Sequence, residues 1–146
     1  MASLEKIIAD ESEITGFIPQ KPPMVMIGKL LSTGGGITRT SFVIPEDNPF
    51  CENGCFLEAG LLENMAQTAA AGVGYIAKLK NRIPPTGFIG GIKNFRVISL
   101  PHSGDELITE ISVEHQIFEA TVVNGKIYHN DVLLAECELK IFLLKN

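Results

Sequence analysis

The sequence predicts an α+β fold in which a curved antiparallel sheet wraps round one long central helix. Apolar residues recur at helical spacing over residues 56–80, strand patterns lie on both sides of that segment, and turn dipeptides separate the strands that follow it. A run of strands beside one helix, without regular strand–helix alternation, is typical of an α+β domain rather than of a parallel α/β sheet.

The totals limit the class of protein. A chain of 146 residues suits a single domain spanning 1–146 with a core of its own. The net charge is -5 and no basic stripe is visible, so the electrostatic pattern of a nucleic-acid binder is missing. Cys51, Cys55 and Cys137 neither complete a disulfide framework nor match the spacing of a metal site. Without a signal core or a bilayer-length apolar segment, we expect a cytoplasmic protein.

The N-terminal third predicts short elements. Leu4, Ile7 and Ile8 have helical spacing, and the three prolines of residues 19–23 exclude a helix or a central strand there. The predicted elements are, in order, a short helix over 3–10, an extended crossing over 19–23, a strand over 24–31, a turn at 34–36, a strand over 37–44 and a loop over 45–49.

The long helix is predicted over residues 57–79. Its apolar positions follow helical spacing, and alanines and glycines are scattered round much of its circumference. A helix that is apolar nearly all round is expected to be buried nearly all round. The small side chains let other backbone come close, which fits a central helix wrapped by a sheet.

The C-terminal strands depend on which turn is used. Strands are predicted over 87–98 and 107–113, and Asn124-Gly125 is the strongest hairpin dipeptide nearby. However, the last strand, over 133–144, needs a long partner. Residues 118–129 supply that partner only if the turn is at Asn130-Asp131, which we therefore predict. Gly125 then lies inside a strand, as a bulge or a point of close approach.

Glu63 does not fit its surroundings. It follows Leu61-Leu62 and precedes Met65-Ala66 on a helix predicted to be buried, and a buried carboxylate is costly unless it is paired. Gln67 lies one turn later on the same face. Glu63 is therefore a candidate general acid or base, although a carboxylate on one wet stripe of the helix explains the pattern equally well.

The residues before the helix are the second candidate. Asn53-Gly54-Cys55-Phe56 would place free backbone amides at its N-terminus, where an anion or a polarised carbonyl oxygen can bind. The alternative is an ordinary helix cap by the Asn53 side chain.

Several motifs resemble a known family. Asn48-Pro49-Phe50, the helix motif Leu62-Glu63-Asn64-Met65-Ala66-Gln67 and the entry Ile18-Pro19-Gln20-Lys21-Pro22-Pro23-Met24 are similar to those of the 3-hydroxyacyl-[acyl-carrier-protein] dehydratases. The resemblance covers nearly the whole chain. It implies a hotdog fold, a dimer that joins two sheets edge to edge, no cofactor and catalysis by Glu63 with Gln67 behind it. The residues that would contact substrate are Phe50, Asn53, Gly54, Cys55, Phe56 and Leu57.

One departure from the family is informative. The family's catalytic histidine lies in a Gly-His-Phe-Pro loop, which here is about five residues shorter and contains no histidine. The chain resembles the short-loop dehydratase-like subgroup of aryl-polyene and related pigment clusters. His102, His115 and His129 lie elsewhere and are expected to be solvated loop residues.

These observations favour a 3-hydroxyacyl-acyl-carrier-protein dehydratase-like enzyme of fatty-acid or polyene biosynthesis. A hotdog thioesterase, acting on acyl-CoA or acyl-carrier-protein thioesters, would use the same residues. A non-catalytic acyl-binding or partner subunit is the third possibility, because fold does not fix function. The expected partners are an acyl carrier protein or a CoA thioester and a second copy of the chain. A basic docking patch could form from Lys21, Lys78, Lys80, Arg82, Lys93 and Arg96, unless these are scattered solubilising charges.

Overall fold

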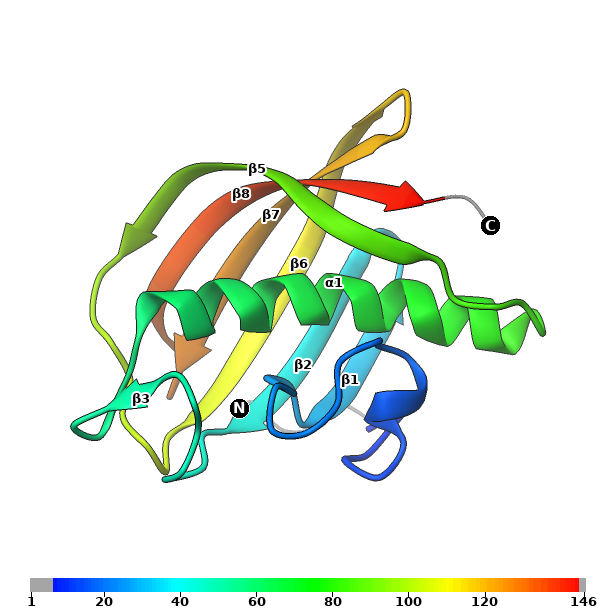
Figure 1. Cartoon of the computed structure of the whole chain (residues 1–146). Coiled ribbons are helices and arrows are strands. Elements are labelled where there is room, and N and C mark those ends of the chain that lie inside the picture. Colours follow the sequence, from blue (N-terminus) through cyan, green and yellow to red (C-terminus); the bar gives the residue numbers. More distant parts are fainter. Residues whose placement is uncertain (1–6, 145–146) are drawn as a thin grey trace.

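The computed structural model describes residues 7–144 and contains one long helix, α1 (Glu58–Leu79), that lies across a curved sheet (Figure 1). The six strands of this sheet all pair antiparallel, in the spatial order β1-β2-β6-β7-β8-β5. They are β1 (Lys29–Gly34), β2 (Ile37–Val43), β5 (Thr86–Val97), β6 (Glu106–Ile117), β7 (Ala120–His129) and β8 (Val132–Leu144). The predicted fold class, a hotdog, is confirmed.

Helix α1 packs most closely on the sheet through its first half. Leu61 and Met65 are completely buried and belong to the core that the sheet lines with Leu107 and Ile127. The expectation that the helix is buried all round is wrong for its second half, where Val73, Ile76 and Leu79 are 36%, 40% and 66% exposed. Apolar spacing alone does not distinguish the face that meets the sheet from a face left open.

The predicted turn between the last two strands is confirmed. Asn130 and Asp131 both have positive φ, 49° and 63°, and join β7 to β8, while Asn124-Gly125 lies inside β7. A Cβ atom on Gly125 would lie 2.6 Å from Met65 Sδ. Gly125 is therefore a point of close approach between the sheet and α1, where a larger residue would force the buried Met65 side chain to move.

The N-terminal predictions need correction. The helix predicted over 3–10 lies partly outside the described residues. Its described end is not helical, because Ala9 pairs with Leu30 beside β1. The strand predicted over 24–31 begins only at Lys29, since residues 24–28 bond to α1 side chains and to Ser41 instead of a strand ladder. Residues 19–23 contain no regular element and end in a turn closed by Met24 N and Lys21 O, 2.8 Å apart; a short 3-10 helix, η1 (Ile14–Gly16), precedes them.

Strands β6 and β7 form a hairpin that extends beyond the rest of the sheet (Figure 1). The strand predicted over 107–113 continues to Ile117, and β7 begins at Ala120 rather than at 118. Phe118 has a φ of 56° and is 101% exposed at the tip. No helix within residues 7–144 is long and apolar enough to cross a membrane.

Candidate functional site

Glu63 and Gln67 lie together on the first half of α1. The Gln67 amide nitrogen donates to Glu63 Oε2 at 2.7 Å and to Met24 O at 2.9 Å, and Gln67 Oε1 accepts from Met26 N at 2.6 Å. Gln67 is completely buried, whereas Glu63 is partly exposed. Both ends of the Gln67 amide are engaged, so Gln67 holds the Glu63 carboxylate in one orientation.

A buried polar network fixes the same part of the helix. Asn64 is completely buried; its amide nitrogen donates to Met26 O at 2.7 Å and its Oδ1 accepts from the Thr109 hydroxyl. Thr68 donates to Asn64 O at 2.8 Å and meets Thr40 Oγ1 at 2.8 Å. These bonds join α1 to β2, to β6 and to the segment before β1. Fully satisfied buried networks of this kind hold a unique geometry.

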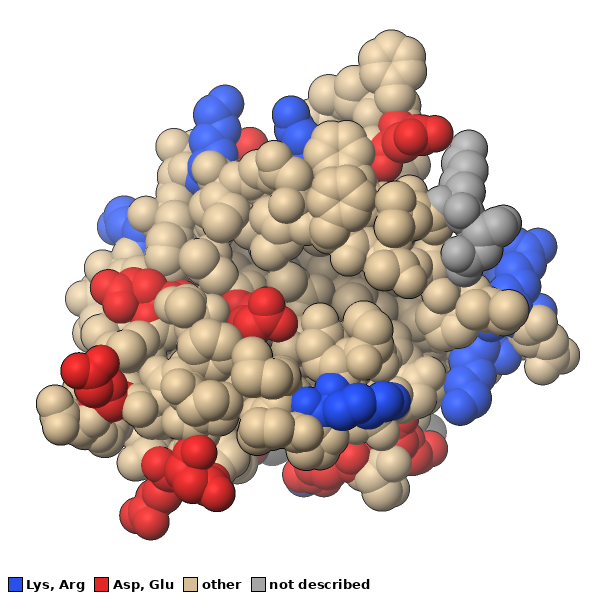
Figure 2. Space-filling model, in the orientation of Figure 1, with Lys and Arg blue, Asp and Glu red and all other residues tan. Residues whose placement is uncertain are grey.

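A cavity of about 440 Å³ continues from this site along the helix. Figure 2 shows a hollow in the middle of the face that carries α1 and β5, surrounded mostly by uncharged residues, with an acidic side chain at its rim. Ala66, Ala70 and Val73 line the cavity and share one face of α1 with Glu63, at steps of three and four residues. Glu63 itself is outside the lining. It lies one turn before Ala66, the first α1 residue of the lining.

The segment before α1 folds differently from its prediction. Residues 51–56 form a hairpin of β3 (Cys51–Glu52) and β4 (Cys55–Phe56), turned by Asn53 and Gly54 with φ of 52° and 79°. Both positive φ values are those of a type I′ hairpin turn, for which Asn-Gly is a preferred dipeptide. The helix begins only at Glu58, so Asn53 does not cap it; Leu57 occupies the cap position without a side-chain bond.

The predicted free amides are therefore in use. Phe56 N donates to Pro101 O at 2.9 Å and Leu57 N to Phe50 O at 3.0 Å. The Gly60 and Leu61 amides both donate to Leu57 O. Among the described residues this leaves the amides of Glu58 and Ala59 without a backbone partner, as expected for a first helical turn.

The predicted substrate-contact residues gather round the start of α1 but do not line the cavity. Phe56 is completely buried, Phe50, Cys55 and Leu57 are half-buried, and Asn53 and Gly54 are exposed at the hairpin tip. Burial, with the neighbouring Cys55 thiol adding to it, raises the pKa of Cys51 above its ordinary value, and burial raises the pKa of Cys137. Both thiols are neutral at pH 7, so neither is prepared as a nucleophile.

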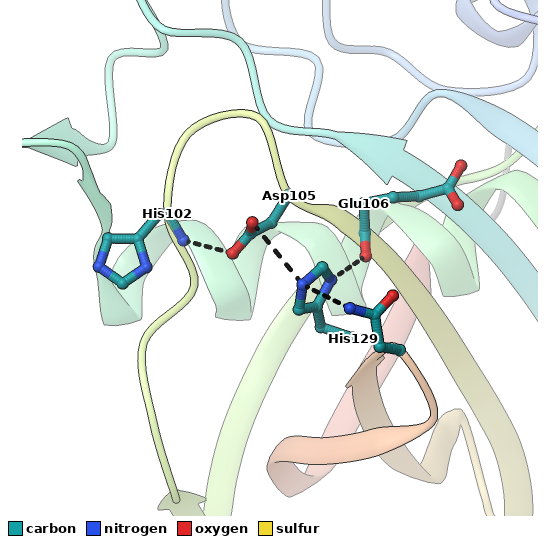
Figure 3. Close-up of polar contacts among 5 residues, drawn as sticks. His102, Asp105, Glu106 and His129 are labelled. Carbon is teal, nitrogen blue, oxygen red and sulfur yellow. Dashed lines mark hydrogen bonds and ion pairs between the residues drawn. The ribbon is translucent and has the colours of Figure 1, made fainter.

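The histidines do not enter the cavity lining, but they are not all loop residues (Figure 3). His115 lies within β6, and His129 ends β7 with Nδ1 2.9 Å from Glu106 O and Nε2 3.7 Å from Asp105 Oδ1. His102 lies in a loop whose backbone pairs with Cys55, and its amide donates to Asp105 Oδ2 at 2.9 Å. Asp105 thus joins two segments, and this cluster braces the loop that supports the β3–β4 hairpin.

The predicted basic patch divides into two groups and the separate Lys21, whose Nζ donates to Thr15 O at 3.4 Å. Lys78, Lys80 and Arg82 follow one another at the end of α1, where Lys78 Nζ lies 5.4 Å from the centre of the Phe17 ring. Lys93 and Arg96 lie on β5, and the Arg96 guanidinium bonds to Glu136 on β8. Basic side chains accordingly appear at separate places on the face shown in Figure 2. Within residues 7–144, no group of three or more His, Cys, Asp or Glu side chains could hold a metal ion.

Comparison with known proteins defines the class. The chain is 31% identical over 111 residues to the 3-hydroxyacyl-[acyl-carrier-protein] dehydratase FabZ of Latilactobacillus sakei, a match that covers 72% of this chain and 77% of that protein. The solved dehydratase heterocomplex ApeI:P of Xenorhabdus doucetiae matches with a TM-score of 0.83 at 17% identity, over 91% of each chain. This is a dehydratase-like hotdog protein, as the sequence predicted.

The particular family follows from a family profile. The profile of the ApeP-like family, described as ApeP dehydratase, matches residues 12–146, and the chain belongs to that family. A hypothetical thioesterase of Streptococcus pneumoniae, solved with coenzyme A, also matches, with a TM-score of 0.63 at 11% identity over 80% of this chain and 85% of that one. At that identity the match shows the shared fold alone.

Sequence reasoning missed the part that the N-terminal segment plays in this site. The backbone of Met24 and Met26 supplies three of the bonds that hold Asn64 and Gln67. Gln20 and residues 16–19 line the cavity. Backbone donors and acceptors are the same at every residue, so the spacing of side chains does not reveal which of them will bond to α1. The signal that was available is the run of prolines at 19–23, which keeps the neighbouring backbone out of a sheet and free to bond elsewhere.

Proposed function

We propose that the chain dehydrates 3-hydroxyacyl thioesters carried by an acyl carrier protein, in fatty-acid or polyene biosynthesis, with Glu63 as a general acid–base residue. The observation that carries this proposal is the Glu63 carboxylate, held by the buried Gln67 amide one helical turn before an apolar cavity. The cavity would take the acyl chain, and the carboxylate would meet the carbons next to the thioester. Gln67 would act through Glu63, by holding its carboxylate, and is therefore a positioning residue.

The chemistry requires one proton to leave C2 and one to reach the hydroxyl on C3. As the C2–H bond breaks, its electron pair forms the C2–C3 double bond, the C3–O bond breaks, and the hydroxyl leaves as water. Glu63 can accept the C2 proton as a carboxylate or deliver a proton to the hydroxyl as an acid. The amides of Glu58 and Ala59, in the first turn of α1, would stabilise a polarised thioester oxygen.

A second acid–base group would come from another chain. None of the three histidines lines the cavity, and β5 is an edge strand whose outward side has no strand partner among the described residues. Phe88 and Ile92 on β5 and Ile76 on α1 are large apolar side chains left exposed beside it. We propose that a second hotdog chain pairs along β5 and completes the site. It would be a copy of this chain or, since the Xenorhabdus dehydratase is a heterocomplex, a different one.

The test of the catalytic role is Glu63→Gln. The amide side chain of this variant keeps the shape and can still accept the hydrogen bond from Gln67, but it cannot transfer a proton. Turnover of a 3-hydroxyacyl carrier-protein thioester to the enoyl thioester, followed by mass spectrometry, should fall at least about 100-fold. The midpoint of urea unfolding should hold. A loss of stability with unchanged turnover would show that Glu63 is structural.

A matched control lies away from the start of the helix. Glu114 is an exposed carboxylate on β6 and does not line the cavity. Glu114→Gln removes the same charge and should leave turnover within about twofold, the scale of a surface charge. Light scattering at micromolar concentration tests the assembly. A dimer supports pairing of two copies, whereas a monomer that gains activity only with a second hotdog chain supports a mixed complex.

A further inference from the structure

Gln20 places a polar side-chain atom in an apolar environment. Its Oε1 atom is buried and, among the residues that the structure describes, has no hydrogen-bond partner. The same residue lines the apolar cavity described above. A buried polar group left unpaired costs about 1–3 kcal/mol. Such groups in folded proteins ordinarily have a partner, so this oxygen is explained best by a partner that enters the cavity.

The position of Gln20 along the helix follows from its neighbours. Phe17 lies against Gly74, where an added Cβ atom would come within 2.0 Å of Phe17 O. Met24 O is bonded to Gln67. Gln20 comes between these two anchors in the chain and lines the same cavity as Ala70, seven residues after Glu63. At 1.5 Å of rise per residue, Ala70 lies about 10 Å along the helix from Glu63, and we place Gln20 at that level of the cavity.

We infer that Gln20 is a specificity-determining residue that pairs with a hydroxyl group, or an equivalent hydrogen-bonding group, on the distal part of the acyl chain. The apolar residues Phe17, Ile18, Ala70 and Val73 line the same cavity, so a plain alkyl chain would bind there without offering a hydrogen bond to the Gln20 oxygen. Rotating the amide by 180° places its nitrogen at the same point, and a hydroxyl can pair with either atom. This inference rests on the proposed function for the direction in which the acyl chain lies.

The separation between Glu63 and Gln20 determines the chain lengths of the acids to be tested. A fully extended chain advances about 1.2 Å per bond, so about 10 Å corresponds to roughly eight bonds beyond the reacting carbons. The hydroxyl should therefore be recognised when it lies near the eleventh or twelfth carbon, about the end of a dodecanoyl chain. The probes are dodecanoic and 12-hydroxydodecanoic acid, with octanoic and 8-hydroxyoctanoic acid as a pair too short to reach Gln20.

The experiment measures binding rather than turnover. Kd values for the four acids are determined by calorimetry. The proteins are the unchanged chain, Glu63→Gln, Gln20→Leu and the double variant that carries both changes. We expect the ratio of affinities, hydroxylated over unsubstituted, to fall at least about tenfold in Gln20→Leu for the twelve-carbon pair, which corresponds to about 1.4 kcal/mol for one good hydrogen bond. The eight-carbon pair should show no change in that ratio.

Two controls separate the possible failures. Thr86→Val removes another polar group from the cavity lining and should leave the ratio unchanged. Because the four acids have no thioester and no hydroxyl on C3, no variant can dehydrate them, and a Gln20-dependent preference supports the inference even if the dehydratase assignment fails. An identical ratio in Gln20→Leu and its parent overturns the inference and indicates that water alone satisfies Gln20. The inference is also overturned if Gln20→Leu still prefers the hydroxylated twelve-carbon acid.

Discussion

The two halves of α1 are attached to the rest of the molecule in different ways. Residues 58–68 are held by hydrogen bonds, through Asn64, Gln67 and Thr68, in addition to the core contacts of Leu61 and Met65. Residues 69–79 are held by shape, through glycines that meet neighbouring atoms and alanines that border a cavity. The first half fixes a carboxylate in place, while the second leaves room for a ligand. One continuous helix thus combines a rigid first half, where we place the chemistry, with a second half whose small side chains leave space for a ligand.

In residues 69–79, which are held by close packing, the largest loss of stability is expected from Gly74→Ala. In an exposed helix this change stabilises by about 1 kcal/mol. Here the new Cβ would lie 2.0 Å from Phe17 O, a backbone atom that cannot rotate away. We expect a loss of about 3 kcal/mol in the free energy of unfolding, measured in urea.

Gly72→Ala is the matched control for that change. Its Cβ would meet Thr38 Oγ1 at 2.4 Å and Thr33 Oγ1 at 2.9 Å, which are ends of side chains that can rotate. The loss should be about 1 kcal/mol. Equal losses at Gly72 and Gly74 would mean that residues 14–18 are not packed rigidly on the helix.

The hydrogen-bonded half is tested by Asn64→Ala. The change leaves Met26 O and the Thr109 hydroxyl without partners in a buried place, which should cost about 2 kcal/mol of unfolding free energy. It should also lower turnover, because Met26 bonds to Gln67 as well. Thr109→Val removes only one of these bonds and should cost about 1 kcal/mol. A neutral Asn64→Ala would contradict the view that this half is held by polar contacts.

The cavity beside the second half is tested by Ala70→Leu. The added carbons would fill space that we assign to the acyl chain, so turnover of long-chain thioesters should fall about tenfold, equivalent to about 1.4 kcal/mol. Short-chain turnover and the unfolding midpoint should change little. Equal effects on short and long chains would argue that the chain does not lie along α1.

The smallest effect is expected at the charged end of α1. Lys80→Glu combined with Arg82→Glu should weaken binding of an acidic acyl carrier protein about fivefold, since each exposed charge contributes up to about 1 kcal/mol. The loss should shrink as salt is added. Turnover of a CoA thioester should not change. Lys93→Glu on β5 tests the other basic group, and a larger effect there would move the docking surface to β5.

Two Asn-Gly dipeptides show how far sequence reasoning reached. At Asn53-Gly54 the dipeptide forms the hairpin turn that its local chemistry favours, although its place just before α1 suggests a helix end. At Asn124-Gly125 the same dipeptide lies inside a strand, because β8 needs a partner of its own length and Gly125 must admit Met65. Length matching over the sheet decided the second case, and only local backbone preference decided the first.

The sequence could predict which side chains form the site, but not the backbone groups that hold them. A carboxylate four residues before a glutamine, in an apolar helix, identifies Glu63 and Gln67 as a pair, and the structure joins them by a hydrogen bond. Their roles remain proposals. The anchor of that pair is the Met24 and Met26 backbone, about 40 residues away in sequence. Main-chain groups are the same at every residue, so no sequence pattern indicated which would reach α1.

The bond from the Met26 amide to Gln67 makes one backbone proton a reporter of the whole site. Met26 is completely buried, and its N–H group lies with the nitrogen 2.6 Å from Gln67 Oε1. That proton can exchange with solvent only when the segment lifts from the helix, which also frees the glutamine that holds Glu63. Its nuclear magnetic resonance signal and exchange rate therefore follow the attachment of the carboxylate without any substrate present. A spectroscopist could watch the site loosen through this one amide.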